Sequence, residues 1–506
     1  MTASTTTIES GWVGDRDPRD DDVRRANELP QVAWLHEYKT KLLASMGKTG
    51  HTPRLRRLPF QQSPRQPDTC TYPLQLLSDI PDLPSSAELE DLRNVFNAIF
   101  ANQEFLQSYE PPVRGTSLSP HLQLAYATIG AVASAQDDPS STGHTAASAS
   151  QLFNAGVRMY GVMTETNNTE SRSGVAVLST TLLATFGVLS VDTADRNWAD
   201  SILGFTLAME RWQKAADDGH PETRRRRSAL TCYVFLVAVL QSLVCDTLPL
   251  MSSEELTLMP STSSGFTEAY SSLSRTIDVN THQLSDHADA LVLLIALLSD
   301  RLFVEHSYRS VSQRPVTADM RNGHGANVLA YPAELMPASA SRDYLDLEHR
   351  TLQSLHRWHD RFASAATKEI LALYYYAELR ISYTNFGGLL RDCGYQSYQR
   401  LVSDEGATHS EVSGQSVRLA WLVLDQVDVR KRRRESLHAI WLPPVLFHSA
   451  LIIWRSQTQQ KTGPCGSLKA LGLFAKELDE LPWPCCGSMA TCLRRLQDPA
   501  LGDRSS

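Results

Sequence analysis

Five large apolar side chains recur at a helical spacing in the middle of this chain: Trp198, Ile202, Phe205, Met209 and Trp212. Steps of four, three, four and three residues bring all five to one side of an α-helix. A β-strand would send them to alternating faces, because its side chains repeat every second residue. The pattern therefore predicts an amphipathic helix over residues 195–215, with this stripe forming part of the structural core.

The same helical period continues along most of the chain after residue 85. Ser86 followed by Glu88 and Glu90 is a helix-start signal, and Pro120 suits the first turn of a second helix. Further helices are predicted over residues 147–165, 173–189, 195–215, 223–246, 282–308, 342–364, 367–392, 411–429, 433–458 and 466–480. Residues 260–280 and 310–340 are predicted to be loops.

Strand alternation, sustained heptads and a fixed-period repeat are not visible in the sequence. The predicted fold is therefore all-α, with a large multi-helix domain over residues 86–400. A C-terminal helical extension over residues 401–506 is expected to pack on that domain. Residues 1–85 are rich in Pro, Ser, Thr, Arg and Asp, which predicts a flexible and partly disordered arm.

Charge and cysteine usage narrow the class of protein. The net charge of the 506 residues is −8, so DNA contact would need a local basic patch. The 8 cysteines are scattered apart from Cys485-Cys486, which is typical of a reducing compartment. The first residues lack a secretory signal, and the apolar runs are shorter than the roughly 20 residues that cross a bilayer. We expect a soluble intracellular protein that does not enter a membrane.

The most informative order of elements lies between Ala194 and Pro260. The Trp-bearing helix is followed by the basic run Arg224–Arg227, the apolar segment Thr231–Cys245 and a loop that ends at Pro260. Upstream lie a Pro-containing loop at 109–112 and helical segments at 122–133, 146–160 and 177–184. This order, over roughly residues 88–400, resembles the fungal-specific transcription factor domain (middle homology region) of zinc-cluster and zinc-finger transcription regulators.

The last helix departs from the family pattern in two places. Cys232-Tyr233 and Leu240-Gln241-Ser242 stand where the family often has a Trp and then an Asp-Arg pair. The resemblance implies a nuclear regulator of RNA polymerase II transcription whose helical domain controls activity, plausibly for a fungal secondary-metabolite gene cluster. It also implies a homodimer or heterodimer that reaches DNA directly or through a DNA-bound partner regulator.

The zinc module of that family has no counterpart in the sequence. A binuclear cluster needs two Cys-x-x-Cys pairs, and residues 1–85 hold only Cys70. We interpret Cys465, Cys485, Cys486 and Cys492 as packing residues. Zinc is expected for the family, but no zinc-binding motif is found, so no cofactor is predicted. The chain would act through a partner, through a weak basic arm, or as part of a longer gene product.

Two basic clusters are candidates for nuclear import or phosphate contact. The denser one comprises Arg430, Lys431, Arg432, Arg433 and Arg434. The other, in the N-terminal arm, comprises Arg54, Arg56 and Arg57. The run Arg224–Arg227 is interpreted as structural, because the resemblance places arginines just before the buried helix.

The main alternative is an all-α biosynthetic enzyme, or a dimerising scaffold, with an apolar cavity. Tyr374-Tyr375-Tyr376 with Glu378 and Arg380 could line such a cavity, although a core helix with a buried ion pair fits the same pattern better. His349, His356 and His359 could bind a metal only if carboxylates converge on them. The run Asp20-Asp21-Asp22 is interpreted as a solvated mixed-charge segment. No catalytic residue is predicted.

Overall fold

The computed structural model describes residues 84–100, 105–106, 119–137, 142–166, 173–215, 221–261, 265–274, 286–312, 338–395, 411–432, 439–459 and 468–497. These residues form fifteen α-helices and one short 3-10 helix, with no strand among them. A single isolated β-bridge joins Leu258 to Gly265 within this described part. The predicted all-α fold is confirmed.

The helices are named in chain order. In order they are α4 (Ser86–Ile99), α5 (Pro120–Asp137), α6 (Thr142–Thr166), α7 (Gly174–Val188), α8 (Thr193–Ala215), α9 (Pro221–Cys245), η3 (Ser253–Glu255), α10 (Phe266–Ser274), α11 (His287–Ser312), α12 (Ala338–Phe362), α13 (Lys368–Ser382), α14 (Phe386–Asp392), α15 (Gly414–Arg432), α16 (Leu442–Gln459), α17 (Leu468–Asp479) and α18 (Pro484–Gln497).

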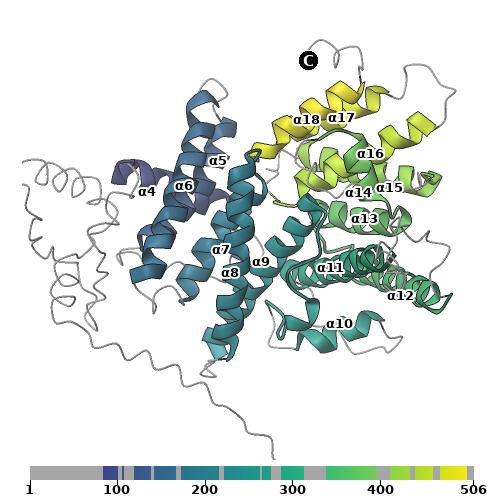
Figure 1. The fold of residues 1–506 in the computed structure, drawn as a ribbon, viewed down its shortest axis with the longest axis horizontal. Coiled ribbons are helices and arrows are strands. Elements are labelled where there is room, and N and C mark those ends of the chain that lie inside the picture. Colours follow the sequence, from purple (N-terminus) through teal and green to yellow (C-terminus); the bar gives the residue numbers. More distant parts are fainter. Residues whose placement is uncertain are drawn as a thin grey trace, which may run out of the picture.

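The N-terminal helices α4–α8 gather on one side of the molecule and α10–α18 on the other (Figure 1). Helix α9 lies between the two groups, since it packs against α7 and α8 on one side and α11 on the other. The C-terminal helix α18 reaches back to the first group: the Cys485 amide donates to the Leu189 carbonyl at 2.9 Å. One continuous hydrophobic core therefore extends from Leu89 to Leu493.

Helices α7 and α9 are the central elements of this core. Ser173 caps α7 by accepting a hydrogen bond from the Ala176 amide at 3.1 Å, and every residue from Ala176 to Val188 is buried. Residues 224–245 of α9 contain an 18-residue window that is apolar enough to cross a membrane, but 89% of that window is buried inside the protein. A helix enclosed by neighbours on all sides must be apolar all round, which explains this composition.

The predicted stripe of α8 is only partly correct. Ile202 and Met209 are buried, but Trp198 is 52% and Phe205 is 47% exposed; for Trp212 the structure describes the backbone only. The buried face of α8 is rotated toward smaller and polar side chains, including Ala199 and Thr206.

Close packing of α8 on α7 explains this rotation. A Cβ atom at Gly187 would lie 2.7 Å from the Cβ atom of Ala199, so the two backbones approach closely there. The Thr206 hydroxyl donates to the Thr180 hydroxyl at 2.7 Å inside the same interface. Small residues and paired hydroxyls thus face α7, and the larger aromatic side chains are left outside.

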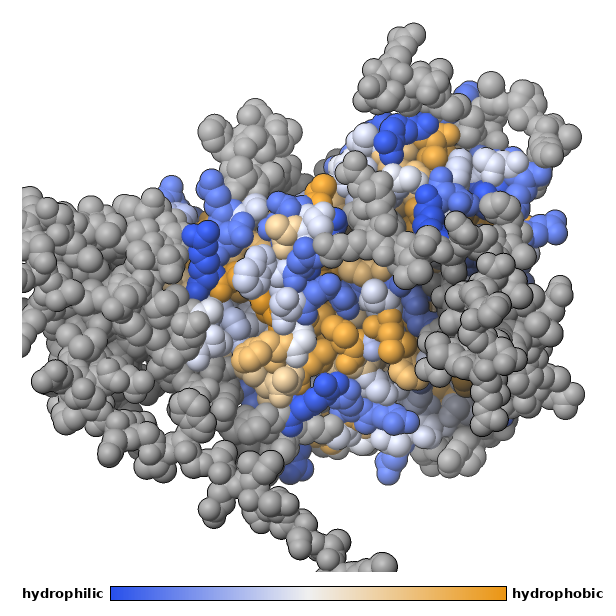
Figure 2. Space-filling model, viewed as in Figure 1, coloured by the Kyte–Doolittle hydropathy of each residue, from blue (hydrophilic) through white to orange (hydrophobic). Residues whose placement is uncertain are grey.

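Hydrophobic side chains also reach the surface elsewhere on this face. Figure 2 shows them, in orange, over the middle of the view in which α8 and α9 lie toward the front. Exposed large apolar residues near this part of the chain include Leu248 and Leu250, in the loop after α9. Isolated exposed apolar residues are common on proteins and do not alone define an interface.

Four helix predictions were wrong in detail. Residues 266–274, predicted as loop, form α10, and α18 was not predicted. The helix predicted over 367–392 is broken, because Tyr383 is extended and the Asn385 side chain caps α14 by accepting from the Gly388 amide at 3.0 Å. The helix predicted from residue 433 begins at Leu442.

The domain boundaries predicted at residues 85 and 400 remain predictions. Residues 1–83, with Cys70, Asp20–Asp22 and the basic cluster at Arg54, Arg56 and Arg57, lie outside the described residues, as do residues 396–410. The C-terminal helices α15–α18 contribute to the same core as the helices before residue 400.

Candidate functional site

A cavity of about 320 Å³ lies where α8, the first half of α9 and the loop after η3 meet. Its lining residues come from these three elements: Glu210, Arg224, Arg227, Ser228, Thr231, Leu256, Thr257 and Leu258. All of them fall within the segment from Ala194 to Pro260 that carries the family resemblance. This volume is at the lower end of the range found for small-molecule sites.

The antiparallel pairing of α8 and α9 brings the polar lining together. The Gln241 amide donates to Asp200 at 2.7 Å near one end of the pair. At the other end, the Arg227 guanidinium donates to the Gln213 carbonyl at 3.0 Å. These two contacts fix which residues of the helices stand opposite each other.

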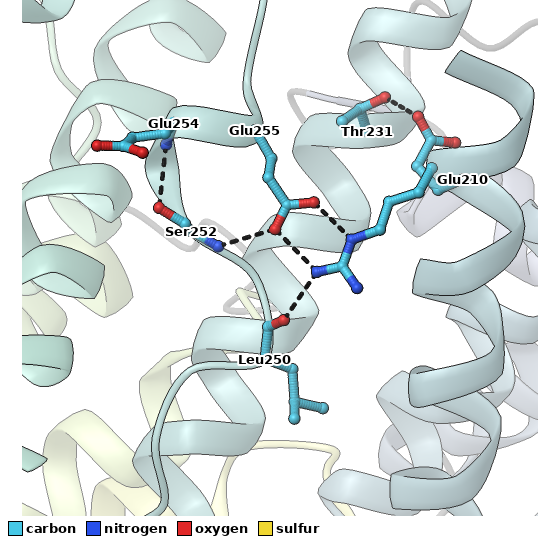
Figure 3. Close-up of polar contacts among 7 residues, drawn as sticks. Glu210, Thr231, Leu250, Ser252, Glu254 and Glu255 are labelled. Carbon is cyan, nitrogen blue, oxygen red and sulfur yellow. Dashed lines mark hydrogen bonds and ion pairs between the residues drawn. The ribbon is translucent and has the colours of Figure 1, made fainter. Parts of the chain in front are cut away.

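This register places Glu210 of α8 opposite Thr231 of α9, and Figure 3 shows the two side chains pointing toward each other. The Thr231 hydroxyl donates to a carboxylate oxygen of Glu210 and also lies 2.9 Å from the Arg227 carbonyl. Glu210 is only 3% exposed. The inner part of the cavity therefore carries a buried carboxylate.

The third wall is the loop that precedes the β-bridge. The Ser228 hydroxyl donates to the Leu258 carbonyl at 2.9 Å, which attaches the loop to α9. The Phe266 amide donates to the Thr257 carbonyl at 3.0 Å. Leu256 is buried, so the loop is also held by the core.

A bidentate ion pair attaches the same loop to α8. The Arg211 Nε and Nη2 atoms lie 2.7 and 2.8 Å from the two carboxylate oxygens of Glu255. Arg211 also donates to the Leu250 carbonyl at 3.3 Å, and the Ser252 amide donates to Glu255 at 3.2 Å. Glu255 lies beside Ser252 and Leu250 in Figure 3. Hydrogen bonding to Glu255 raises the pKa of Arg211, so this guanidinium stays charged.

The charges of the cavity are arranged along α9. Arg224 is exposed and Arg227 half-buried, whereas Ser228 and Thr231 are buried. Arg224, Arg227 and Thr231 are spaced three and four residues apart, which places them on one face of the helix. The outer part of the cavity is therefore cationic, and the inner part presents the Glu210 carboxylate.

The sequence pointed to part of this site. The run Arg224–Arg227, interpreted as structural, forms early turns of α9, and two of its four arginines line the cavity. Glu210 was missed, although it stands seven residues after Leu203 and so continues the buried face of α8. Glu210 lines the cavity only because α8 pairs with α9, and the helical period of α8 alone does not predict that pairing.

The predicted import cluster lies at the end of α15. Arg430, Lys431 and Arg432 are its last three residues. Arg433 and Arg434 fall outside the described residues. Basic residues at a helix C-terminus also complement the helix dipole, so the import role remains a prediction.

The three histidines of α12 have separate partners. The His356 Nε2 atom lies 3.0 Å from Glu378, His359 stacks near the Tyr374 ring at 4.8 Å, and His349 hydrogen-bonds with Gln353 at 2.7 Å. Across the described ranges, no group of three or more His, Cys, Asp or Glu side chains is placed to hold a metal ion.

The cysteines of α18 are buried: Cys485, Cys486 and Cys492. Cys465 lies outside the described residues.

The aromatic helix α13 takes part in a buried ion pair, but the acidic partner lies on α11 and is not Glu378. Arg380 lies 3.0 Å from Glu305 of α11, and its guanidinium carbon lies 4.3 Å from the centre of the Phe386 ring. The Tyr376 hydroxyl lies 2.6 Å from Nδ1 of His448. Burial, and then the charge of Arg380, lowers the pKa of His448 to about 3, so this histidine is neutral. These buried polar groups therefore form hydrogen bonds and an ion pair with one another inside the core.

No protein-family model matches the chain, and searches of curated proteins and of solved structures find no similar protein.

Proposed function

We propose that this chain regulates RNA polymerase II transcription and that its helical body responds to a small ligand bound between α8 and α9. The observation that carries the proposal is the cavity itself. It is built by the Trp-bearing helix, the arginine-preceded helix and the Pro-terminated loop, which are the three elements on which the resemblance mainly depends.

The order of elements gives further support. Helices α5 to α9 succeed one another over residues 120–245, and the loop follows directly, which is the order that the resemblance implies. Helix α9 packs on both α7 and α11. A ligand held at its first half therefore contacts an element that touches both halves of the molecule, and binding energy there can bias their packing.

The route to DNA belongs to the same proposal. The regulator acts in the nucleus as a homodimer or heterodimer, either by binding DNA itself or through a DNA-bound partner. The basic cluster at residues 430–434 supplies the import signal.

A tethering experiment tests the regulatory role without knowledge of the natural DNA site. The full chain is fused to an unrelated DNA-binding domain and placed upstream of a reporter gene in a fungal host. We expect reporter output to change several-fold relative to the DNA-binding domain alone. Unchanged output from a fusion that is expressed, nuclear and bound to the reporter would contradict the proposal.

A further inference from the structure

From its charges and size, we infer that the cavity between α8 and α9 binds a small carboxylic acid that carries an amino or hydroxyl group near its carboxylate. This inference rests on the proposed function for its biological meaning. The binding itself is a property of the described residues and can be measured separately.

The carboxylate end of the ligand is recognised by the arginines. Arg224 and Arg227 bring two positive charges to the cavity and Glu210 brings one negative charge. The lining therefore has a net positive charge and favours a singly charged anion. Planar guanidinium groups pair with carboxylates through two parallel hydrogen bonds, which gives orientation as well as affinity.

The second group of the ligand is recognised deeper in the cavity. Glu210 is a buried acceptor that receives a hydrogen bond from the Thr231 hydroxyl, and a carboxylate can accept several such bonds. An ammonium or hydroxyl group donates to such a carboxylate, whereas a second ligand carboxylate would be repelled by it. The seven-residue step from Arg224 to Thr231 spans about 10 Å along the helix. The step from Arg227 to Thr231 is only four residues, about 6 Å, so a short molecule with its two polar groups close together can reach both positions.

The size and wall chemistry exclude large apolar effectors. The volume of about 320 Å³ holds a molecule of roughly amino-acid size. The apolar contribution comes from Leu256 and Leu258 in the loop, and the remaining lining side chains are charged or carry hydroxyls. A long hydrocarbon or a polycyclic product would cover the charged and hydroxyl-bearing side chains and remove their water, which costs free energy.

Calorimetric titration of the full chain tests this inference. The probes are the twenty standard amino acids and the singly charged 2-hydroxy acids glycolate and lactate, each at millimolar concentration. Malate and citrate, whose additional carboxylates Glu210 should repel, are expected to bind more weakly. Acetate, ethylamine and inorganic phosphate serve as controls that carry only one of the two recognised features. We expect at least one amino or hydroxy acid to bind saturably and to raise the melting temperature, while the single-feature controls do not.

Matched variants assign the binding to the cavity. R224Q/R227Q removes the two lining arginines and should raise the dissociation constant by about tenfold or more. R225Q/R226Q removes the same charge from the same helix at two exposed positions outside the lining and should bind like the parent chain. Circular dichroism melts of both variants show that each is folded.

Three results would overturn the inference: no probe binds, binding survives in R224Q/R227Q, or phosphate and acetate bind as well as the best amino or hydroxy acid. Failure here is distinguishable from failure of the proposed function. A tethered reporter that responds although no probe binds overturns the ligand class alone. Saturable binding with an unresponsive reporter retains the site and removes its regulatory role.

Discussion

Arg380 holds a positive charge in the middle of the helical core, where an unpaired charge would be very costly. Its side chain and that of Glu305 are 2% and 3% exposed, and their charged atoms lie 3.0 Å apart. Removing one partner leaves the other buried without its counter-charge. We therefore expect Arg380→Met to destabilise the protein by about 3–5 kcal/mol.

The double variant E305M/R380M is the control for that prediction. It removes both charges and keeps similar volume, so it should recover much of the lost free energy of unfolding. Urea unfolding monitored by circular dichroism measures both changes. A double variant as unstable as R380M alone would contradict the assignment of the cost to an unpaired charge.

Phe205 tests the corrected orientation of α8. Its ring lies 6.0 Å from the Tyr160 ring but remains half-exposed. Phe153 is fully buried against Phe186 at 5.0 Å, so Phe153→Ala should cost about 3–5 kcal/mol. We expect Phe205→Ala to cost less than half as much. Equal losses in urea unfolding would mean that this face of α8 is covered in solution.

The packing of α4 on α5 depends on a residue without a side chain. A Cβ atom on Gly130 would overlap the carbonyl oxygen of Leu92, which belongs to the backbone of α4 and cannot rotate away. Gly130→Ala should therefore force the two helices apart and cost about 1–3 kcal/mol.

Gly204 provides the matched control for this element-scale prediction. It also lies inside a helix, α8, but a Cβ atom there would meet open space. Gly204→Ala should stabilise the protein by about 0.5–1 kcal/mol, because alanine has the higher helix propensity. Thermal melts of the two variants should shift in opposite directions, and two shifts of the same sign would contradict the close approach.

Periodicity was sufficient to locate α8 and α9, since residues 195–215 and 223–246 were predicted and Thr193–Ala215 and Pro221–Cys245 are observed. It did not give the rotation of α8, because hydrophobicity does not report that Ala199 and Thr206 fit the close contact with α7. The break before Asn385 was missed because a capping side chain outweighed a continuous apolar pattern. Glu210 lines the cavity because of how α8 is aligned against α9. This alignment is a tertiary property that the periodicity of one helix does not predict.

The molecule as a whole is organised around α9, which links the helices on both sides into one core. The candidate cavity lies at one end of this helix, next to a loop held by Arg211 and Glu255. The salt bridge is partly exposed and contributes little stability by itself. Glu255 directly precedes Leu256 of the cavity lining, so the salt bridge holds the start of the loop that forms one wall.

Chromatin occupancy tests most directly whether this chain regulates genes. A tagged version of the full 506-residue chain is immunoprecipitated from its native host, with an untagged strain as the control. We expect a nuclear protein with sharp peaks upstream of a small set of genes. The DNA sequence under those peaks would identify the DNA-binding domain that recruits it. No enrichment over the control, with the protein spread through the cytoplasm, would contradict the account.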